Sequence, residues 1–281
     1  MDWIERFNAA VRYMEEHLDD QIDYDRLAKI ACCSTYHYQR MFGYMAGIPL
    51  SEYIRRRRMS CAAADLLGGE RVLDTALKYG YESPTAFNRA FQAVHGVAPS
   101  SAKQSGVTLK SFPPLSFKMT IKGVEEMNYR IEKKPSFRIV GVREAISTDV
   151  EDVFAMVPLF WQKSAPLIPQ LVSMMDGTPQ GVLGVSTCNE VENQQNYYYI
   201  AVASSLAVPE GMHECIIPEV TWAIFSGSGT VGALQTLQQR IVSEWLPTSG
   251  YEWANATDVE VYLNNDPANM QFEVWLPIVK K

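Results

Sequence analysis

The chain has 281 residues, which at roughly 100–200 residues per domain is enough for two domains with a core each. No apolar run approaches the ~20 residues of a membrane span, the start does not resemble a signal peptide, and five cysteines, an odd number, are typical of a reduced, cytoplasmic protein. The net charge of −7 is uneven, because residues 1–108 hold 13 basic and 13 acidic side chains whereas residues 109–281 hold 12 and 19, and this indicates two different roles.

The first part of the chain, residues 1–105, is predicted to be an all-α domain of short helices. An amphipathic first helix is followed by a short helix, a tight turn, a capping Ser34 and a second helix over about 35–45. The same order returns later, with Ser83 before a helix over 84–95. This pattern indicates an internal duplication of a helix-turn-helix unit, with one long helix between the two copies.

The second helix of each copy carries side chains suited to reading DNA. Gln and Arg can bond base edges bidentately, and Tyr38 and Phe42 define a separate, buried side of the first of these helices. Two such helices on one body would enter major-groove segments about one helical turn (~34 Å) apart. Every amphipathic helix has a polar face, but two copies in the same context favour DNA reading. The predicted residues are Thr35, Tyr36, Gln39 and Arg40 in the first copy, and Thr85, Asn88 and Arg89 in the second.

The long helix between the copies contains YIRRRRMSCAAADLL, with four successive arginines at 55–58. At 100° per residue these span about 300°, so they cannot form one DNA-facing patch. We expect Arg58 to be an internal strut whose head pairs with a carboxylate such as Asp65 or Asp74. The other expectations are a solvated Arg56 and a phosphate contact from Arg55 or Arg57.

The later part of the chain changes its periodicity from helix to strand. Residues 106–126 contain Pro113-Pro114 and are interpreted as a linker or connecting strand. From residue 127 the order strand–helix–strand–strand occurs twice. Residues 127–281 are therefore predicted to form an α+β domain with a largely antiparallel sheet.

The segment GSGTVG, residues 227–232, has the glycine spacing of a dinucleotide site and lies between a predicted strand and helix. The following strand, DVEVYLNN, alternates polar and apolar residues, unlike a buried parallel strand. The acids Asp258 and Glu260 also come later than the ~20 residues expected for a ribose contact. We interpret the segment as a strand-to-helix turn, and neither a metal nor a cofactor is predicted.

Acidic and aromatic residues in the later domain suggest a site for a small molecule. In QFEVWLPI, strand alternation puts Glu273 and Trp275 on one face. A carboxylate among aromatic rings can hold a lipophilic cation through charge pairing and cation–π contact. From the pattern alone, a solvated Glu273 over an aromatic core is the favoured alternative. The candidate ligand-binding residues are Glu273, Trp275, Trp222, Trp161, Phe160, Tyr197 and Tyr199.

The helical domain resembles the DNA-binding domain of the AraC family of transcription regulators, in LAKIACCSTYHYQRMF, then DTALKYGYES, FNRAF and GVAPS. The resemblance implies that the residues named above on the two second helices face the major grooves. Two departures matter. Cys32 stands where the family usually has glycine, and Pro84 and Thr85 replace longer side chains, so the second helix is expected to read fewer bases.

The later domain resembles GyrI-like effector-binding domains in its repeat, in TWAIFSGSG and in the closing FEVWLPI. This implies a cleft for amphipathic, often cationic small molecules, with Glu273 inside and Trp275, Trp222 and Trp161 as walls. Together the resemblances imply a ligand-responsive bacterial transcription regulator that is not an enzyme. Its expected partners are double-stranded promoter DNA, a small-molecule effector and RNA polymerase. The alternatives are a hydrolase that uses the cleft glutamate as a general base, or a domain that sequesters a protein or toxic compound.

Overall fold

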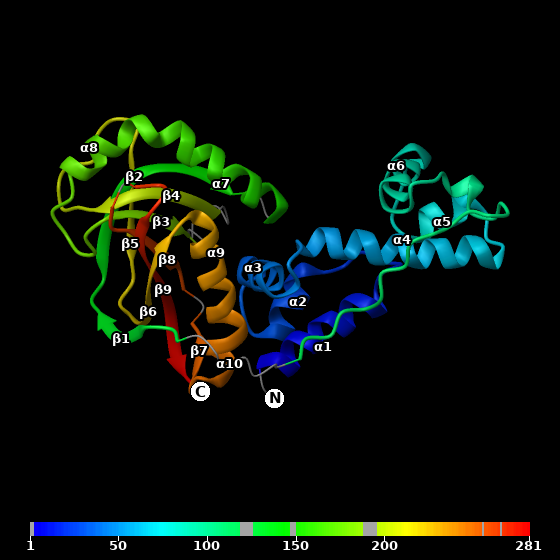
Figure 1. The fold of residues 1–281 in the computed structure, drawn as a ribbon, viewed down its shortest axis with the longest axis horizontal. Coiled ribbons are helices and arrows are strands. Elements are labelled where there is room, and N and C mark those ends of the chain that lie inside the picture. The colour runs from blue at the N-terminus through cyan, green and yellow to red at the C-terminus, as the bar shows by residue number, and fades with distance from the viewer. Residues whose placement is uncertain (1–2, 119–125, 147–149, 188–195, 255, 265) are drawn as a thin grey trace. The chain divides into compact units, whose positions relative to one another are not determined.

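The computed structural model describes residues 3–118, 126–146, 150–187, 196–254, 256–264 and 266–281. The chain divides into two compact units, Met1–Lys118 and Met119–Lys281 (Figure 1). The first is helical and the second combines helices with an antiparallel sheet, which confirms the predicted fold class. No helix among the described residues is long and apolar enough to span a bilayer.

The helical unit contains the two predicted helix-turn-helix copies. Its elements are α1 (Trp3–Glu16), α2 (Tyr24–Ala31), α3 (Thr35–Ala46), α4 (Leu50–Gly68), α5 (Val72–Lys78), α6 (Pro84–His95) and the 3-10 turn η1 (Pro99–Ser101). Helices α2–α3 and α5–α6 are the copies, and α4 joins them (Figure 1). Ser34 accepts a hydrogen bond from the backbone N–H of His37, and Ser83 accepts one from Ala86, so both predicted caps form.

The turn of the first copy holds Cys32 in a left-handed conformation, with φ 56° and ψ 41°. Among the described residues it is the only one other than glycine with a positive φ. The turn of the second copy has Gly80 at φ 80° instead. A side chain at such an angle brings Cβ close to the following carbonyl oxygen, so the departure from glycine at residue 32 carries a conformational cost.

Cys32→Gly should therefore raise the free energy of unfolding by about 1 kcal/mol, because relief of this strain exceeds the extra chain entropy of glycine. The shift in the urea midpoint of the full chain measures it. The matched change Cys61→Gly, inside α4, should instead lower stability by about 1 kcal/mol. A midpoint for Cys32→Gly equal to or below that of the parent chain would contradict the strain argument.

Residues 107–118, named the strap from here on, belong to the helical unit and are not a free linker. Phe112 packs beside the core of the second copy. The ring of Phe117 lies 6.0 Å from that of Phe7 on α1 and 5.7 Å from that of Phe42 on α3. The compact unit thus extends past the predicted boundary at residue 105, because apolar side chains of the strap pack on its core. Residues 119–125 of the predicted linker lie outside the described part of the chain.

The buried strut of α4 is Arg57 and not Arg58. Arg57 is only 9% exposed, its Nη2 lies 2.7 Å from Glu15 on α1, and Nη1 donates to the backbone oxygen of Phe112. Burial lowers the pKa of Arg57, but hydrogen bonding to Glu15 and its charge more than compensate and raise it. Of the two arginines predicted as alternative phosphate contacts, Arg57 has its guanidinium bonded inside the unit, which leaves Arg55.

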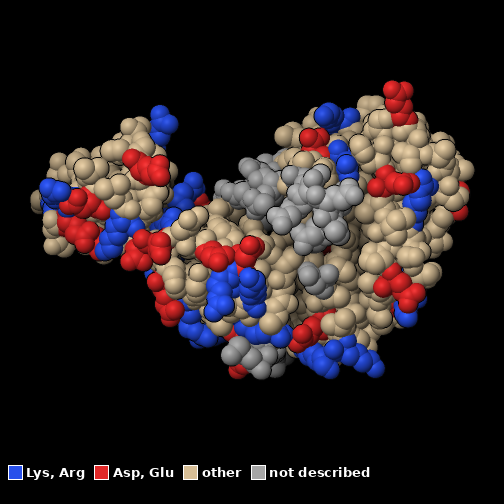
Figure 2. Space-filling view, turned by 180° about the vertical axis from the view of Figure 1, so that it is seen from behind, with Lys and Arg blue, Asp and Glu red and all other residues tan. Residues whose placement is uncertain are grey.

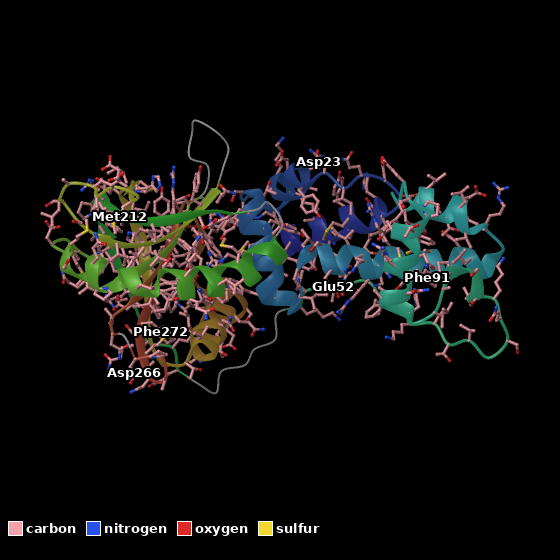
Figure 3. All side chains as sticks on the ribbon, turned by 90° about the horizontal axis from the view of Figure 1, so that it is seen from above. Asp23, Glu52, Phe91, Met212, Asp266 and Phe272 are labelled. Carbon is pink, nitrogen blue, oxygen red and sulfur yellow. The ribbon has the colours of Figure 1, made fainter. Side chains whose placement is uncertain are left out.

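The other arginines of the run also have partners within the helical unit. Arg58 donates to the backbone oxygens of Leu18 (2.9 Å) and Asp20 (2.6 Å), so it is a strut, but with carbonyls and not with the predicted carboxylates. Asp65 instead accepts from Lys78 and Tyr79, and Asp74 pairs with Arg71. Arg56 lies over the ring of Phe112 at 5.1 Å and pairs with Glu52, so it is not simply solvated. Figure 3 labels Glu52 on α4 and Phe91 in the second copy.

His95, at the end of α6, is buried and joins α4 to the strap. Its Nε2 lies 3.0 Å from the oxygen of Met59, and its Nδ1 accepts from the N–H of Lys110 at 3.1 Å. These two bonds need a neutral ring that carries its hydrogen on Nε2. Burial lowers the pKa of His95, with a further lowering from the charge of Lys110, although the Met59 carbonyl opposes it.

The unfolded chain, with an ordinary imidazole pKa, takes up a proton before the folded chain does as the pH falls. Stability from His95 is therefore intact above pH ~6.5 and is lost as the pH falls below it. The urea midpoint of the full chain should decrease between pH 7.5 and 5.5, and His95→Gln should remove part of this decrease. His17→Gln, which changes a histidine outside the strap contacts, is the matched control. Equal pH dependence in the parent chain and in His95→Gln would refute this assignment.

The second unit is built on one antiparallel sheet. Its strands are β1 (Tyr129–Lys134), β2 (Phe137–Ile146), β3 (Val182–Ser186), β4 (Asn196–Ala203), β5 (His213–Ile217), β6 (Val220–Gly229), β7 (Tyr251–Trp253), β8 (Asp258–Tyr262) and β9 (Met270–Lys280). Its helices are α7 (Val150–Ser164), η2 (Ala165–Leu167), α8 (Ile168–Ser173), α9 (Val231–Arg240), the π-helical η3 (Ile241–Trp245) and α10 (Leu246–Thr248). The strand order is β1-β6-β9-β8-β3-β4-β2-β5, with β7 beside β9.

The two predicted repeats are β2-α7-β3-β4 and β6-α9-β8-β9. The stretch predicted as one strand before the first helix is two strands, because Pro135 separates β1, which pairs with β6, from β2, which pairs with β4 and β5. Strands β5 and β7 were not predicted. Strand β6 pairs antiparallel with β1 and β9, and α9 begins directly after it. This confirms GSGTVG as a strand-to-helix turn, since a dinucleotide site needs parallel strands.

Candidate DNA-binding and ligand-binding sites

Helix α6 presents the predicted reading residues of the second copy. Phe87 and Phe91 are fully buried on its inner side. On the outer side Thr85 and Arg89 are exposed and Asn88 is partly exposed. The helix begins at Pro84, whose missing N–H costs nothing at the first helical position. Polar side chains long enough to reach base edges therefore project from α6, while Phe87 and Phe91 fix the helix in the core.

Helix α3 of the first copy is divided into an inner and an outer side in the same way as α6. Tyr38 and Phe42 lie on its inner side, where Tyr38 contacts the ring of Phe7 at 4.7 Å. Tyr36, Gln39 and Arg40 lie on the other side by helical phase, and all three are buried in this structure, so their contact with bases stays a prediction.

Side-chain contacts also fix Arg40 and Thr35, two of the predicted DNA-reading residues of α3. Arg40 donates from Nε to the hydroxyl of Tyr44 at 3.1 Å, and its guanidinium lies 5.6 Å from the centre of the Tyr44 ring. Thr35, at the start of the helix, donates to Asp25 of α2 at 2.8 Å. The first contact orients a DNA-reading candidate, and the second fixes α3 against α2.

Arg55 is the predicted phosphate contact that still projects from α4. Its side chain is 47% exposed, although it pairs with Glu52. On the face of the molecule that Figure 2 shows, blue and red groups alternate on the helical unit, in keeping with its balanced charge. DNA affinity would therefore depend on a few placed side chains more than on a broad positive field.

The sheet divides the predicted ligand-binding residues between its two faces. Directly paired residues of an antiparallel sheet share a face. Trp275 pairs with Val259 and Ile224, Val259 pairs with Val185, and Val185 pairs with Tyr199. This side, named the aromatic face, also carries Trp222, Tyr197 and Glu273, two residues from Trp275 along β9. Phe160 and Trp161 of α7 lie on the opposite side, so the seven residues do not form one site.

Glu273 is held by a cation of the same domain. Arg130 of β1 binds it through two nitrogens, at 2.8 and 3.2 Å, and the indole N–H of Trp275 donates to it at 2.8 Å. The hydrogen bonds to Glu273 are the main reason why the pKa of Arg130 is raised. Trp222 and Tyr199 are fully buried in the sheet core. The aromatic face is thus packed protein interior whose carboxylate already has its counter-ion.

A second carboxylate, Glu260 of β8, lies on the other side, named the helix face. It pairs with Gly184 of β3 and Val274 of β9. Its Oε1 accepts from Gln238 of α9 at 2.6 Å, and its Oε2 accepts from the hydroxyls of Tyr262 (2.9 Å) and Tyr198 (3.2 Å). The carboxylate of Glu260 on β8 therefore links this strand to α9 and to Tyr198 of β4.

Helix α7 completes the surroundings of Glu260. The indole N–H of Trp161 donates to the hydroxyl of Tyr198 at 3.0 Å, and the Trp161 ring lies edge-on to Tyr262 at 4.8 Å. Phe160 contacts Tyr198 as well, with ring centres 6.5 Å apart. Both helices thus supply groups around one carboxylate at the centre of the sheet.

Gly184 makes this arrangement sterically possible. A Cβ at that position would lie 2.3 Å from the hydroxyl of Tyr198 and 2.9 Å from Oε2 of Glu260. The tyrosine can therefore lean across β3 to the carboxylate only because residue 184 has no side chain. The sequence carries a signal for Glu260, an acid in the middle of the strand DVEVY, but strand alternation alone does not place it beside α7 and α9.

Within the part of the chain that the structure describes, no three His, Cys, Asp or Glu residues are grouped so as to hold a metal ion.

Two known protein families match the chain, one for each of its two domains. The family described as GyrI-like small molecule binding domain matches residues 127–279, and a helix-turn-helix domain family matches residues 27–105. The chain belongs to the GyrI-like small molecule binding domain family.

Relatives share the order of a helix-turn-helix domain followed by a GyrI-like domain. The chain is 25% identical over 288 residues to the transcriptional regulator Rob of Salmonella typhimurium and 26% over 289 residues to the right origin-binding protein of Escherichia coli, with 95% of each chain covered. It is 38% identical over 89 residues to the transcriptional activator AarP of Providencia stuartii, which covers 31% of this chain and 66% of AarP. The helix-turn-helix and GyrI-like domains together make the chain a ligand-responsive transcription regulator, as the sequence predicted.

Proposed function

We propose that the GyrI-like domain binds a lipophilic cation beside Glu260 and that this binding changes how α3 and α6 engage promoter DNA. The observation that carries the proposal is the contact set of Glu260, a partly buried carboxylate with Trp161, Tyr198 and Tyr262 around it. Contact with RNA polymerase, and a place in the cytoplasm, belong to the same proposal.

The chemistry of these contacts fits a cation. The amide of Gln238 and the hydroxyls of Tyr198 and Tyr262 donate to the carboxylate and orient it beside the aromatic rings. The faces of nearby tyrosine and tryptophan rings attract a cation and accept its apolar groups. Glu273 differs in its surroundings, because Arg130 binds it through two nitrogens on the aromatic face.

The same contacts supply a physical link from ligand to protein conformation. A ligand at Glu260 would compete with Gln238 of α9 and would displace Trp161 of α7 from Tyr198. Both helices would then have a different lowest-energy position with and without ligand. Such differential binding to two states is what regulation by a ligand requires.

DNA recognition on this proposal depends on the outer sides of α3 and α6. Arginine can bond a guanine edge bidentately and Asn or Gln an adenine edge, so Arg40 and Arg89 would read guanine and Gln39 and Asn88 adenine. Arg55 would add a phosphate contact without choice of sequence.

Arg40→Ala and Arg89→Ala should each lower the affinity of the full chain for its selected DNA by about 10- to 100-fold, since one good base contact contributes ~1–3 kcal/mol. The DNA is selected from a random pool with the parent chain, and affinity is measured by gel shift at fixed salt. Arg71→Ala is the matched control, because Arg71 is 79% exposed on the side-chain scale and precedes α5. Unchanged affinity in both test variants would end the assignment of α3 and α6 as DNA readers.

Glu260→Gln should weaken binding of tetraphenylphosphonium to the full chain by at least about tenfold, because the charge partner of the cation is lost inside a partly desolvated site. Calorimetric titration measures this, and the neutral compound triphenylphosphine oxide should bind weakly to the parent chain. Glu273→Gln is the matched control and should bind the cation as the parent does. If Glu273→Gln alone abolishes binding, the site lies on the aromatic face and Glu260 is structural.

A hydrolase is the second candidate, because Glu260 accepts hydrogen bonds from two tyrosine hydroxyls and could act as a general base beside them. Turnover of a strained-ring electrophile by the parent chain, lost in Glu260→Gln, would support this candidate. Cation binding without any turnover would support the regulator instead.

A further inference from the structure

Side chains of the surrounding helices bind the backbone of the strap. Four of its N–H groups donate to side-chain acceptors of the helices: Lys110 to His95 Nδ1 (3.1 Å), Phe112 to Ser60 Oγ (2.9 Å), Leu115 to Tyr53 Oη (3.0 Å) and Phe117 to Asn8 Oδ1 (2.8 Å). Two of its carbonyls are also bonded, that of Phe112 by Arg57 and that of Phe117 by Asn8 at 2.9 Å. An extended segment fixed by this many side chains is a docked element, since each bond opposes the entropy of a free chain.

The strap runs in the direction opposite to α4. It begins beside α6, at His95, passes Ser60 and Tyr53 of α4, and ends beside α1 at Asn8. The green trace beneath α4 and α1 in Figure 1 follows this path. The strap therefore touches the second helix-turn-helix copy at one end and the first copy, through Phe42 of α3, at the other.

Each end of α4 meets a glycine with a positive φ. Gly47 precedes the helix at φ 70°, and Gly69 follows it at φ 113°. Backbone rotation at such glycines is sterically easy, so the positions of the copies depend on side-chain packing on α4, of Phe42 against Tyr53 at one end and of Phe87 in the core with Met59 at the other, and on the strap. The strap passes alongside α4 and makes contacts beyond both glycines, with α6 at one end and with α1 and α3 at the other.

We propose that the docked strap holds the two helix-turn-helix copies at one separation. The strap and the side chains that bind it would then determine the half-site spacing of the DNA that the protein recognises. The DNA part of this inference rests on the proposed function. The brace itself is a property of the helical unit and is testable without DNA.

The test uses full-length Ser60→Ala and Asn8→Ala, whose side chains lie off the predicted reading sides. Ser243→Ala is the matched control, because Ser243 Oγ donates to a carbonyl four residues earlier in its helix, as Ser60 does to Arg56, but lies in the other unit. Asn8→Asp keeps the acceptor for Phe117 and loses only the donor, so it should show a smaller effect.

Hydrogen exchange followed by mass spectrometry is the first measurement. Exchange of strap amides should rise by about tenfold in Ser60→Ala and Asn8→Ala, the factor expected from one net hydrogen bond. Exchange around Gly47 and Gly69 should rise with it, and neither change should occur in Ser243→Ala. A looser strap with unchanged exchange at both glycines would overturn the brace, and so would a strap that exchanges as in the parent.

Half-site spacing is the second measurement. The parent chain should bind its selected DNA at least about tenfold more tightly than the same DNA with one base pair inserted between half-sites. The strap variants should bind the selected DNA more weakly and lose most of this discrimination. Full discrimination in a variant with a loosened strap would refute the spacing role. If the parent chain binds no DNA at all, the proposed function fails while the exchange result still decides the brace.

Discussion

The helical unit depends on the carboxylate of Glu15. It accepts two nitrogens of Arg57 and the hydroxyl of Tyr53, at distances of 2.6–3.0 Å. Each partner then reaches the strap, Arg57 through the carbonyl of Phe112 and Tyr53 through the N–H of Leu115. Loss of such a carboxylate leaves a largely buried guanidinium without its partner, which typically costs about 3–5 kcal/mol. One side chain of α1 thus supports the helix between the two DNA-reading copies and the segment that connects them.

The sequence predicted the helices, the caps and the inner aromatic sides of α3 and α6, because these are local features with a helical period. It did not predict which arginine of α4 is buried. Four successive arginines point in different directions, and α4 is covered by different neighbours at each end, with buried residues that include both Ile54 and Met59 on different sides. The strap was missed for a related reason: its bonds to Ser60 and Asn8 span 52 and 109 residues and leave no periodic signal.

The choice between Glu273 and Glu260 shows a limit of strand alternation. Alternation assigned Glu273 and Trp275 to one face correctly, but it does not say which face the helices cover. That question is usually answered by polarity, since one face of an antiparallel sheet is often solvated. Here neighbouring residues of β4, Tyr199 and Ile200, are both fully buried, so both faces are apolar and polarity gives no answer. The helix contacts at Glu260 come from segments far apart in the sequence and required the fold.

The hydrogen bond from Trp161 to Tyr198 gives the GyrI-like domain an internal optical signal. Indole emission responds to hydrogen bonding and to the polarity around the ring, and Trp161 is only partly buried at the edge of the contact set of Glu260. Trp222 and Trp275 lie in one core cluster of the domain, and Trp245 and Trp253 lie in or against another, so Trp161 is the indole that contacts the set around Glu260. Occupancy at Glu260 would thus be visible as a change in the light emitted by the domain itself, without a label on the protein or on the ligand.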